Sequence, residues 1–276
     1  MAVDTVAVGT AVGPTAPVLG QALRTSRRGL AVWCAALVGL TALYSALWPG
    51  LRDQPGYAQV VRSLPAVLRS LLATADLTTA AGYVQAELFG LTAPLVVVAY
   101  AVTSAAGLAA DEERGRLDLL LAQPVSRTGV LLGRAGATAL GTAVLAGVTG
   151  GALLVAGALG GPRLPVGHVA AAALHLGLLG WVFGALATAV AGATGRLTAS
   201  RAVPGVLAVL AYVLNGVAPL AGWPAAVRDL SPFAQYAAGP PLVAGVSGSG
   251  VVIALGTSAV LLAVALVAFR RRDIGI

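Results

Sequence analysis

Lysine is missing from this chain of 276 residues, because all 17 of its basic residues are arginines. A Walker A loop requires a lysine after its glycines, since an ammonium group must reach the terminal phosphates of the nucleotide. The chain therefore cannot bind and hydrolyse ATP by that route. We expect no cofactor on the chain itself.

Cysteine and histidine are almost as scarce. Cys34 is the one cysteine, so no intrachain disulfide can form, and we interpret this residue as a small packing residue. The two histidines, His168 and His175, cannot form a zinc site of the HExxH kind, and the sequence has no GxSxG turn. We therefore expect no metal site and no catalytic residues. His175 lies in an apolar segment, where it is either a polar helix-packing residue or a proton relay.

Charged residues make up only 10% of the chain, and we expect the ten acids outside the long apolar segments or at their edges. Hydrophobic residues make up 58%, and the mean hydropathy is +0.90. Soluble domains carry about 25% charged residues, so the chain is expected to be a membrane protein. The lack of carboxylates within the apolar segments argues against a proton- or sodium-driven pump. The net charge of +7 fits contact with lipid headgroups, and nucleic acid is not expected as a partner.

Six apolar segments reach the length of about 20 residues that a membrane-crossing helix needs. They are approximately 29–49, 88–110, 135–160, 169–193, 202–220 and 250–269. We therefore predict an all-α membrane protein with six transmembrane helices in a single domain, 1–276. We also expect an outer helical cap in the proline-rich connection between the fifth and sixth spans, 221–249. No cleavable signal peptide is expected, because arginines directly precede the first span.

The arginines gather on alternate sides of these spans. With six spans both ends of the chain lie on one side, and twelve arginines fall there: Arg24, Arg27, Arg28, Arg114, Arg116, Arg127, Arg134, Arg196, Arg201, Arg270, Arg271 and Arg272. The other five fall on the opposite side: Arg52, Arg62, Arg69, Arg163 and Arg228. Because cytoplasmic loops carry an excess of basic residues, we predict that both termini, including residues 1–28, and the 111–134 loop are cytoplasmic.

Pairs of glycines four residues apart permit close approach of helices in membranes. Gly147/Gly151 and Gly180/Gly184 are two such pairs. With 36 glycines in the chain such pairs also arise by chance, so the sequence does not decide which of them pack.

The 111–134 loop is the cytoplasmic connection with the clearest pattern. Three acids that suit a helix N-terminus open it: Asp111, Glu112 and Glu113. Three leucines at helical spacing follow: Leu117, Leu120 and Leu121. Pro124 would end this helix, and Ser126 would cap the next one, which continues into the third span. The residues fit equally well a solvated elbow whose leucines rest on the bilayer and a docking helix for a soluble partner.

This loop contains a longer motif, with further short motifs in order along the chain. Its residues are Glu112, Glu113, Arg114, Gly115, Leu117, Asp118, Leu119, Leu120, Leu121, Pro124, Val125, Ser126 and Arg127. The others lie at 52–56, 131–134, 215–219, 231–233 and 269–273. Together they resemble the type-2 permeases of ATP-binding-cassette (ABC) exporters, which commonly read close to E-E-x-G-T-L-D-L-L-L-x-x-P-V-S-R after the second span. Arg116 departs from this pattern, since a threonine is frequent at its position.

The resemblance implies a half-transporter in the bacterial plasma (inner) membrane. Two permease copies, identical or different, would pair, and two separate ABC ATPase subunits, which bind ATP and Mg²⁺, would dock beneath them. The coupling helix of such permeases lies between spans two and three, which places ATPase coupling at Glu112, Glu113, Gly115, Leu117, Asp118, Leu120, Leu121, Pro124 and Arg127. An amphipathic N-terminal helix at 19–28 is expected along the inner membrane surface.

A substrate route between the second and fifth spans is also implied by this resemblance. Candidate lining residues, carried over by span, are Tyr100, Thr103, Tyr212 and Asn215. An amide at span depth needs a hydrogen-bond partner, so Asn215 would either link two helices or contact substrate. Walls with so little charge fit a hydrophobic or amphiphilic cargo, such as a drug, a peptide or a lipid, better than a small ion.

Two other functions remain open. A membrane scaffold or sensor would hold an ATPase at the bilayer without moving a solute. A membrane-embedded enzyme would need polar residues converging at one depth, and the spans offer only scattered hydroxyls with His175 and Asn215. The main hypothesis is a permease that couples ATP hydrolysis by its partners to drug efflux, as in antibiotic resistance.

Overall fold

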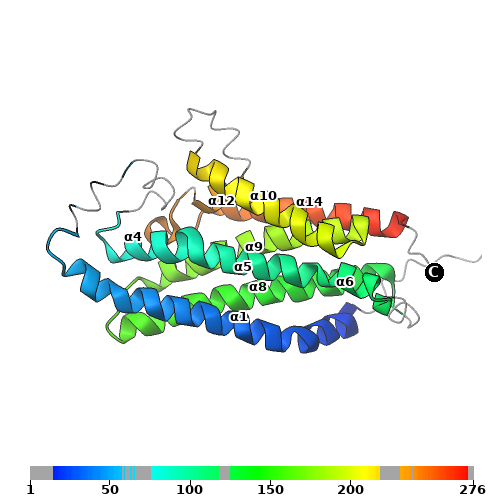
Figure 1. Cartoon of the computed structure of the whole chain (residues 1–276), viewed down its shortest axis with the longest axis horizontal. Helices are drawn as coiled ribbons and strands as arrows, with labels where there is room; N and C mark the ends of the chain where they lie inside the picture. Colours follow the sequence, from blue (N-terminus) through cyan, green and yellow to red (C-terminus); the bar gives the residue numbers. More distant parts are fainter. Residues whose placement is uncertain are drawn as a thin grey trace, which may run out of the picture.

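The computed structural model describes residues 15–57, 59, 63, 65, 76–117, 125–217, 231–237 and 239–272. Every regular element in these ranges is a helix. Six helical segments are long and apolar enough to cross a membrane, which confirms the predicted all-α architecture with six spans. The long helices lie side by side along the longest axis of the molecule (Figure 1).

The spans extend beyond their predicted bounds at several ends. The first is α1 (Thr15–Arg52), and the second joins four consecutive segments: α4 (Ala80–Val84), η1 (Gln85–Thr92), α5 (Ala93–Ala105) and α6 (Gly107–Glu113). The remaining spans are α8 (Arg127–Ala158), α9 (Val166–Thr194), α10 (Leu197–Val217) and α14 (Gly248–Arg271). The 34 residues of the second span cover about 51 Å at 1.5 Å per residue, against about 30 Å of hydrocarbon. Its two ends, of which the inner one carries Asp111, Glu112 and Glu113, can therefore project into the headgroup regions.

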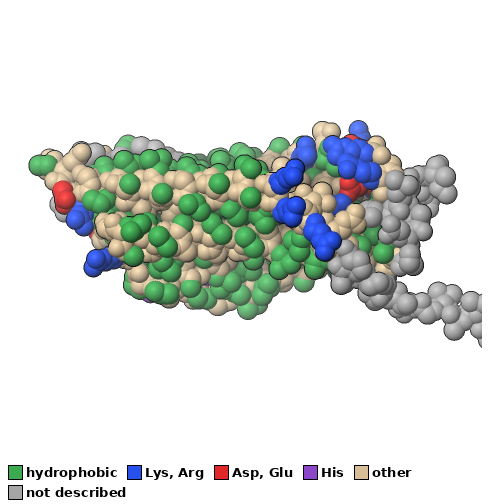
Figure 2. Space-filling model, turned by 90° about the horizontal axis from the view of Figure 1, so that it is seen from below, with side chains coloured by type: hydrophobic (Ala, Val, Ile, Leu, Met, Phe, Trp, Pro, Cys, Tyr) green, Lys and Arg blue, Asp and Glu red, His purple; other side chains and the backbone are tan. Residues whose placement is uncertain are grey.

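The first residues of α1, the end of α6 and the last turn of α14 lie at the same end of the molecule (Figure 1). We call this the inner end, and the opposite one the outer end. Figure 2 shows arginine side chains gathered toward the inner end, with a predominantly apolar surface between the two ends. By the excess of basic residues in cytoplasmic loops, the arginine-rich end is predicted to face the cytoplasm, and this orientation stays a prediction.

Local sequence signals explain several helix ends. Ser126 caps α8 as predicted, because its hydroxyl accepts a hydrogen bond from the backbone N–H of Gly129 at 3.0 Å. Gly195 ends α9 with a positive φ of 64°, a conformation that glycine adopts without steric cost. Residues 19–28, expected as a separate surface helix, instead form the first turns of the continuous helix α1.

α9 is the central helix, and it packs against α5, α8, α10 and α14. In its most apolar stretch 61% of the residues are buried, against 17% in α10 and 11% in α14. The outward faces of α10 and α14 are therefore available to lipid or to another protein. α1 packs mainly on α8, at the edge of the bundle.

The two glycine pairs behave differently. A Cβ on Gly180 would overlap Val97 of α5, and one on Gly184 would press against Thr138 of α8. Neither Gly147 nor Gly151 has a neighbour within 4 Å of such a Cβ. Only the pair on the central helix is required for close packing.

Two short helices, α12 (Pro232–Ala237) and α13 (Pro241–Ala244), precede α14 in the connection from α10. The buried Tyr236 donates its hydroxyl hydrogen to the carbonyl oxygen of Phe89 at 2.8 Å. The Leu242 N–H donates to the side-chain oxygen of Gln85 at 3.2 Å. Both acceptors belong to η1, so α12 and α13 are bonded to the second span. Residues 218–230, including part of the predicted outer cap, lie outside the described residues.

Candidate functional site

A groove lies between the second span and α10. Its walls come from η1, α5 and α10, and Phe233 of α12 contributes at its outer end. The cavity has a volume of about 460 Å³, within the range of about 300–1,000 Å³ typical of ligand pockets. Aliphatic side chains dominate its lining, among them Leu91, Leu95, Val98, Val102, Ala208 and Val209. The groove can therefore hold an apolar molecule or part of one.

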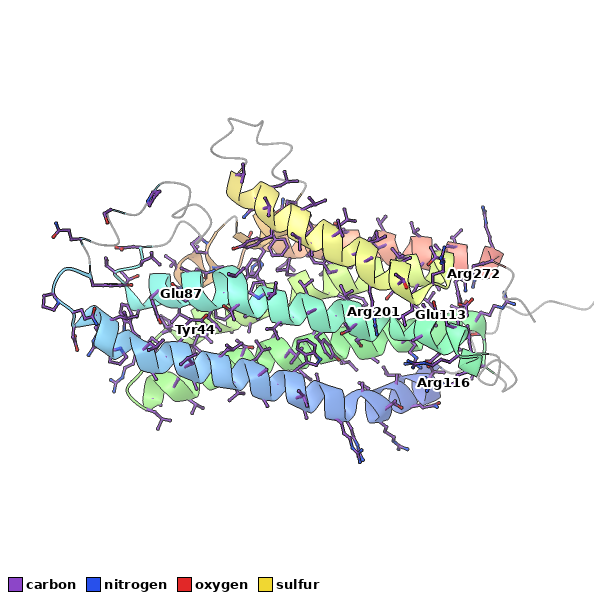
Figure 3. The ribbon with its side chains drawn as sticks, viewed as in Figure 1. Tyr44, Glu87, Glu113, Arg116, Arg201 and Arg272 are labelled. Carbon is purple, nitrogen blue, oxygen red and sulfur yellow. The ribbon has the colours of Figure 1, made fainter. Side chains whose placement is uncertain are left out.

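The two walls run in opposite directions, because consecutive spans alternate their course across the bundle. Thr103 and Arg201 lie toward the inner end of the groove, whereas Leu91 and Tyr212 lie toward its outer end. Arg201 carries the one charge among the described residues that line the groove. Figure 3 shows its side chain close to α5, toward the inner end. The groove is therefore apolar along its length and basic at one end.

Thr103 and Tyr212, two of the four predicted path residues, line this groove. The Thr103 hydroxyl donates a hydrogen bond within its own helix; the carbonyl oxygens of Ala99 and Tyr100 lie 2.7 Å and 3.0 Å from it. The Tyr212 ring meets Phe233 edge-on, with 5.5 Å between ring centroids. The structure thus brings together one predicted residue from each of the second and fifth spans.

Tyr100 and Asn215 lie elsewhere. Tyr100 is 4% exposed, and its ring meets Trp33 of α1 edge-on at 6.4 Å between centroids. Its hydroxyl lies so close to Gly141 of α8 that a Cβ there would overlap it. Tyr100 instead lines a second cavity of about 230 Å³ between α1, α5 and α8. Asn215 is half-buried near the outer end of α10 and is not among the residues that line the groove.

The acids of the predicted coupling region end a helix rather than begin one, so that part of the prediction is wrong. Asp111 and Glu112 lie in the last turn of α6, where the helix dipole disfavours negative charge. Arginines compensate for this. Asp111 pairs with Arg134 of α8 and, at 3.6 Å, with Arg116. Glu112 pairs with Arg272, directly after α14.

Glu113, the last residue of α6, contacts a further helix. Its carboxylate accepts a hydrogen bond from the Leu197 N–H at 2.8 Å, at the first residue of α10. A carboxylate is favourable there, because a helix N-terminus has free N–H groups and a positive dipole end. Figure 3 shows Glu113 and Arg272 close together at the inner end. Asp111, Glu112 and Glu113 thus connect α6 to α8, α14 and α10.

Five of the nine predicted coupling residues are described. Gly115 has a positive φ of 66°, which turns the chain after α6. Leu117 is 1% exposed and packs in a cluster with residues such as Val130 and Phe269, so its side chain does not face outward. Arg127 donates to the carbonyl oxygen of Arg272 at 3.1 Å. Glu112 and Glu113 have the partners given above, and the other four lie outside the described residues: Asp118, Leu120, Leu121 and Pro124.

Glu87, predicted to lie outside the spans or at an edge, belongs to the outer part of the second span, which is long enough to extend beyond the hydrocarbon. It is seven residues inside the second span, in the π-helix η1, and it is half-buried. The hydroxyls of Tyr44 and Thr92 are hydrogen-bonded at 3.1 Å, and the Thr92 hydroxyl also donates to the Glu87 carbonyl oxygen at 2.9 Å. π-Helical turns are frequent at functional sites. No sequence pattern signalled this one.

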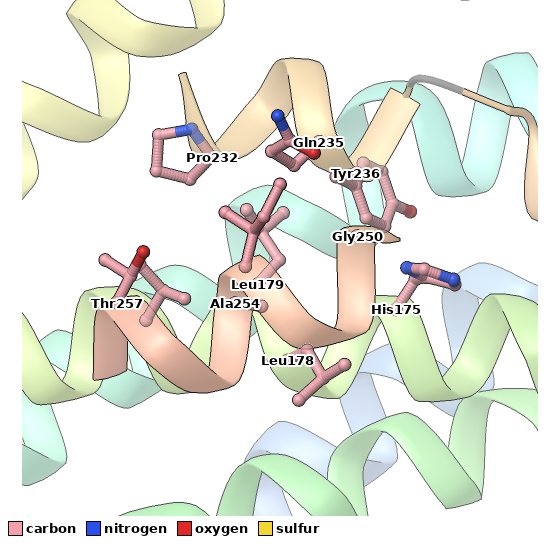
Figure 4. Close-up of a pocket in the computed structure, with 11 residues that line it drawn as sticks. His175, Leu178, Leu179, Pro232, Gln235, Tyr236, Gly250, Ala254 and Thr257 are labelled. Carbon is pink, nitrogen blue, oxygen red and sulfur yellow. The ribbon is translucent and has the colours of Figure 1, made fainter. Parts of the chain in front are cut away.

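His175 belongs to α9 and packs against the start of α14. It is 4% exposed, and its Nε2 atom accepts a hydrogen bond from the Ser247 N–H at 3.1 Å. The cavity beside it has a volume of about 60 Å³, enough for a few water molecules (Figure 4). This size argues against a substrate site at His175. Among the described residues, no three candidate metal ligands gather into a site that could hold a metal ion.

The sequence was also compared with known proteins. The family model described as "Multidrug efflux system permease Rv1217c, C-terminal domain" matches residues 16–270. A comparison with curated proteins finds no match to the chain. The matched residues include nearly the whole chain and all six spans. The chain is therefore a multi-pass membrane protein that belongs to the family of the multidrug efflux permease Rv1217c, an ABC-2-type permease.

Proposed function

We propose that two copies of this chain form the membrane-embedded part of an ATP-driven exporter in the bacterial inner membrane, with both termini in the cytoplasm. Two ABC ATPase subunits, which carry ATP and Mg²⁺, dock at the inner end. The exporter moves hydrophobic or amphiphilic compounds along a route built from the groove between the second span and α10. The observation that carries this proposal is that groove, which unites Thr103 and Tyr212 in a chain of the efflux-permease family.

The contacts at the inner end support a physical route for coupling. An ATPase that moves the 112–127 region displaces the end of α6. The bond from Leu197 to Glu113 passes this displacement to α10, one wall of the groove. The pair of Glu112 with Arg272 passes it to the end of α14. Closure of the ATPases is thereby converted into a rigid-body change of the spans.

The test is to co-express the chain with an ABC ATPase encoded beside it, reconstitute the complex in vesicles, and measure ATPase activity and ATP-dependent export. Glu113→Arg and Leu120→Asp are expected to reduce both activities at least tenfold. Glu113→Gln retains an oxygen that can accept the Leu197 hydrogen bond, so it should keep most of the coupling. Arg163→Glu, in the connection between α8 and α9 at the outer end, serves as the control.

Unchanged assembly and coupling in Glu113→Arg and Leu120→Asp would show that the ATPase docks elsewhere. A membrane scaffold predicts a different result, in which the ATPase binds through the same region but no solute moves in the wild-type complex.

A further inference from the structure

Arg201 is exposed, and among the described arginines it is the one that lines the groove. Arg134 and Arg272 pair with carboxylates, and Arg127 and Arg270 donate to oxygen atoms within the chain. The Arg201 guanidinium has no ion pair or hydrogen bond with any described residue, as is also true of the exposed Arg196 and Arg271; it differs from these two in lining a mostly aliphatic groove. A guanidinium in such a place has hydrogen-bonding capacity left for a ligand.

The length of the groove fits one leaflet of a bilayer. From Thr103 to Leu91 the α5 and η1 wall has 13 residues, whose ends are about 18 Å apart at a rise of 1.5 Å per residue. A single leaflet has about 15 Å of hydrocarbon, half of the bilayer core. Arg201 is four residues inside α10, about 6 Å from the start of that helix. Its guanidinium can therefore reach the inner headgroup level while the aliphatic walls lie at the depth of the lipid tails.

We propose that the groove selects amphiphiles with an anionic head group, which enter sideways from the inner leaflet. The head group pairs with the Arg201 guanidinium, and the apolar tail lies between α5 and α10 toward Leu91 and Tyr212. Charge-assisted hydrogen bonds from a guanidinium favour carboxylate, phosphate or sulfate heads. This inference rests on the proposed function, because it names the class of cargo for that route.

The composition of the groove disfavours cationic cargo. A lipophilic cation would need a carboxylate or an open aromatic face beside it. No acid is among the described residues that line the groove, and its two aromatic rings, Tyr212 and Phe233, pack edge-on against each other toward the outer end. Arg201 would in addition repel a cationic head. A cargo without charge would leave the guanidinium unpaired beside the apolar tail.

The first test compares two photoreactive probes of equal chain length, an alkyl phosphate and an alkyl trimethylammonium, each with a diazirine near the end of the tail. The purified permease is labelled in uncharged detergent without ATPase or ATP, and the sites are mapped by mass spectrometry. The anionic probe should label α5 and α10 at least tenfold more than the cationic probe. Arg201→Glu should reverse this preference and Arg201→Lys should retain it. Arg196→Glu, at an exposed arginine outside the groove, is the matched control.

The second test fills the groove. Gly205 lines it, and a Cβ there has no neighbour within 4 Å, so Gly205→Leu adds bulk without a clash at the Cβ. This variant should lose most labelling by the anionic probe. Gly256→Leu on α14 is the control, because Gly256 is equally open and does not line the groove.

Equal labelling by the two probes, anionic labelling that survives Arg201→Glu, or labelling that survives Gly205→Leu would each overturn the inference. The inference would also be overturned if a second copy of the chain covered the groove. That arrangement would give a disulfide between two Gly205→Cys chains in a Cys34→Ser background, together with absent labelling. Binding is measured on the permease alone, so its outcome is separate from ATP-driven export. Selective labelling without export would contradict the proposed function and leave the anionic site in place.

Discussion

Glu112 and Arg272 form a largely enclosed ion pair at the inner end, with side chains 21% and 18% exposed. Arg272 also donates to the Ala191 carbonyl oxygen at 3.4 Å and lies over the ring of Phe269. Removal of one member leaves the other charge partly buried without its partner, which typically costs about 3–5 kcal/mol for a fully buried pair. Because this pair retains some solvent, we expect Glu112→Ala to lower the free energy of unfolding by about 2–3 kcal/mol.

The measurement is unfolding in mixed detergent micelles, with Arg271→Ala as the matched control. Arg271 is the neighbouring residue and is exposed, so its removal should change the free energy by less than about 0.5 kcal/mol. The charge swap Glu112→Arg with Arg272→Glu should recover part of the loss. Equal effects of Glu112→Ala and Arg271→Ala would mean that the pair contributes nothing to stability.

Tyr236 donates a buried hydrogen bond to the Phe89 carbonyl oxygen in η1. Tyr236→Phe keeps the ring but removes the hydroxyl that donates to this carbonyl oxygen. Because the buried oxygen then lacks a donor, we expect the free energy of unfolding to fall by about 1–3 kcal/mol. Tyr212→Phe removes a hydroxyl that has no hydrogen bond to any described residue, and its loss should be smaller than about 0.5 kcal/mol. Thermal unfolding of the two variants side by side would test the difference.

Burial also raises the pKa of the Tyr236 phenol above its ordinary value. Its folded-state pKa therefore lies above the unfolded value of about 10. The stability that this group contributes is fully present below pH 10 and decreases as the pH rises above it. In an ultraviolet titration of the folded protein, Tyr236 should ionise later than exposed tyrosines. Tyr236→Phe should remove one late-ionising group, and an unchanged titration curve would contradict this assignment.

At the scale of the helix, Gly180 and Gly147 are expected to respond to alanine with opposite signs. The new methyl group of Gly180→Ala overlaps Val97, a β-branched residue with few rotamers. Overpacking of this kind costs about 1–3 kcal/mol. Gly147→Ala has open space, so the higher helix propensity of alanine should stabilise α8 by up to about 1 kcal/mol. Unfolding of both variants in the same detergent measures the two signs. A loss of stability in both variants would show that Gly147 is packed.

The apolar composition of the spans made the number of transmembrane helices predictable. The cap at Ser126 was predictable because serine is a preferred N-cap residue and Pro124 ends the segment before it. The identity of the packed glycines was not predictable, because Gly147/Gly151 and Gly180/Gly184 have the same spacing and only the position of the neighbouring helix distinguishes them. The ends of the helices were also missed. Helices continue past the hydrocarbon wherever their polar residues find partners, as Asp111 does with Arg134.

The π-helix η1 shows the same limit for the candidate site. Its sequence from Gln85 to Thr92 contains Gly90 and is followed by Pro94, but neither residue specifies wider turns rather than an ordinary helix. The contacts that accompany it come from distant parts of the chain, since Tyr44 bonds to Thr92 and Tyr236 bonds to Phe89. The groove was foreseen only as an interface between two spans. The sequence placed Arg201 among the arginines of the inner side, but it did not indicate that Arg201 lines the groove.

Across the whole molecule, charge and apolar surface are separated along one axis (Figure 2). The inner end carries most of the described arginines and the acids of α6, and the groove begins about one helical turn from that end, at Arg201. A partner that binds the inner end therefore lies close to the groove without having to enter the bilayer. This arrangement is consistent with a division of labour between ATP hydrolysis and transport.

Orientation in the membrane is the property on which this arrangement depends. Arg163 lies in the outer connection between α8 and α9, and Arg196 lies in the inner connection between α9 and α10; both are exposed. In a Cys34→Ser background, Arg163→Cys should react with a membrane-impermeant maleimide on intact cells. Arg196→Cys should react only after the membrane is permeabilised. The two positions are separated by one span, α9, so any fixed topology in which α9 crosses the bilayer must label them from opposite sides. The reverse pattern would place the Glu112, Glu113 and Arg272 cluster outside the cell, where no ATP-hydrolysing partner could act on it, and the proposed coupling would be wrong even if the groove binds its ligand.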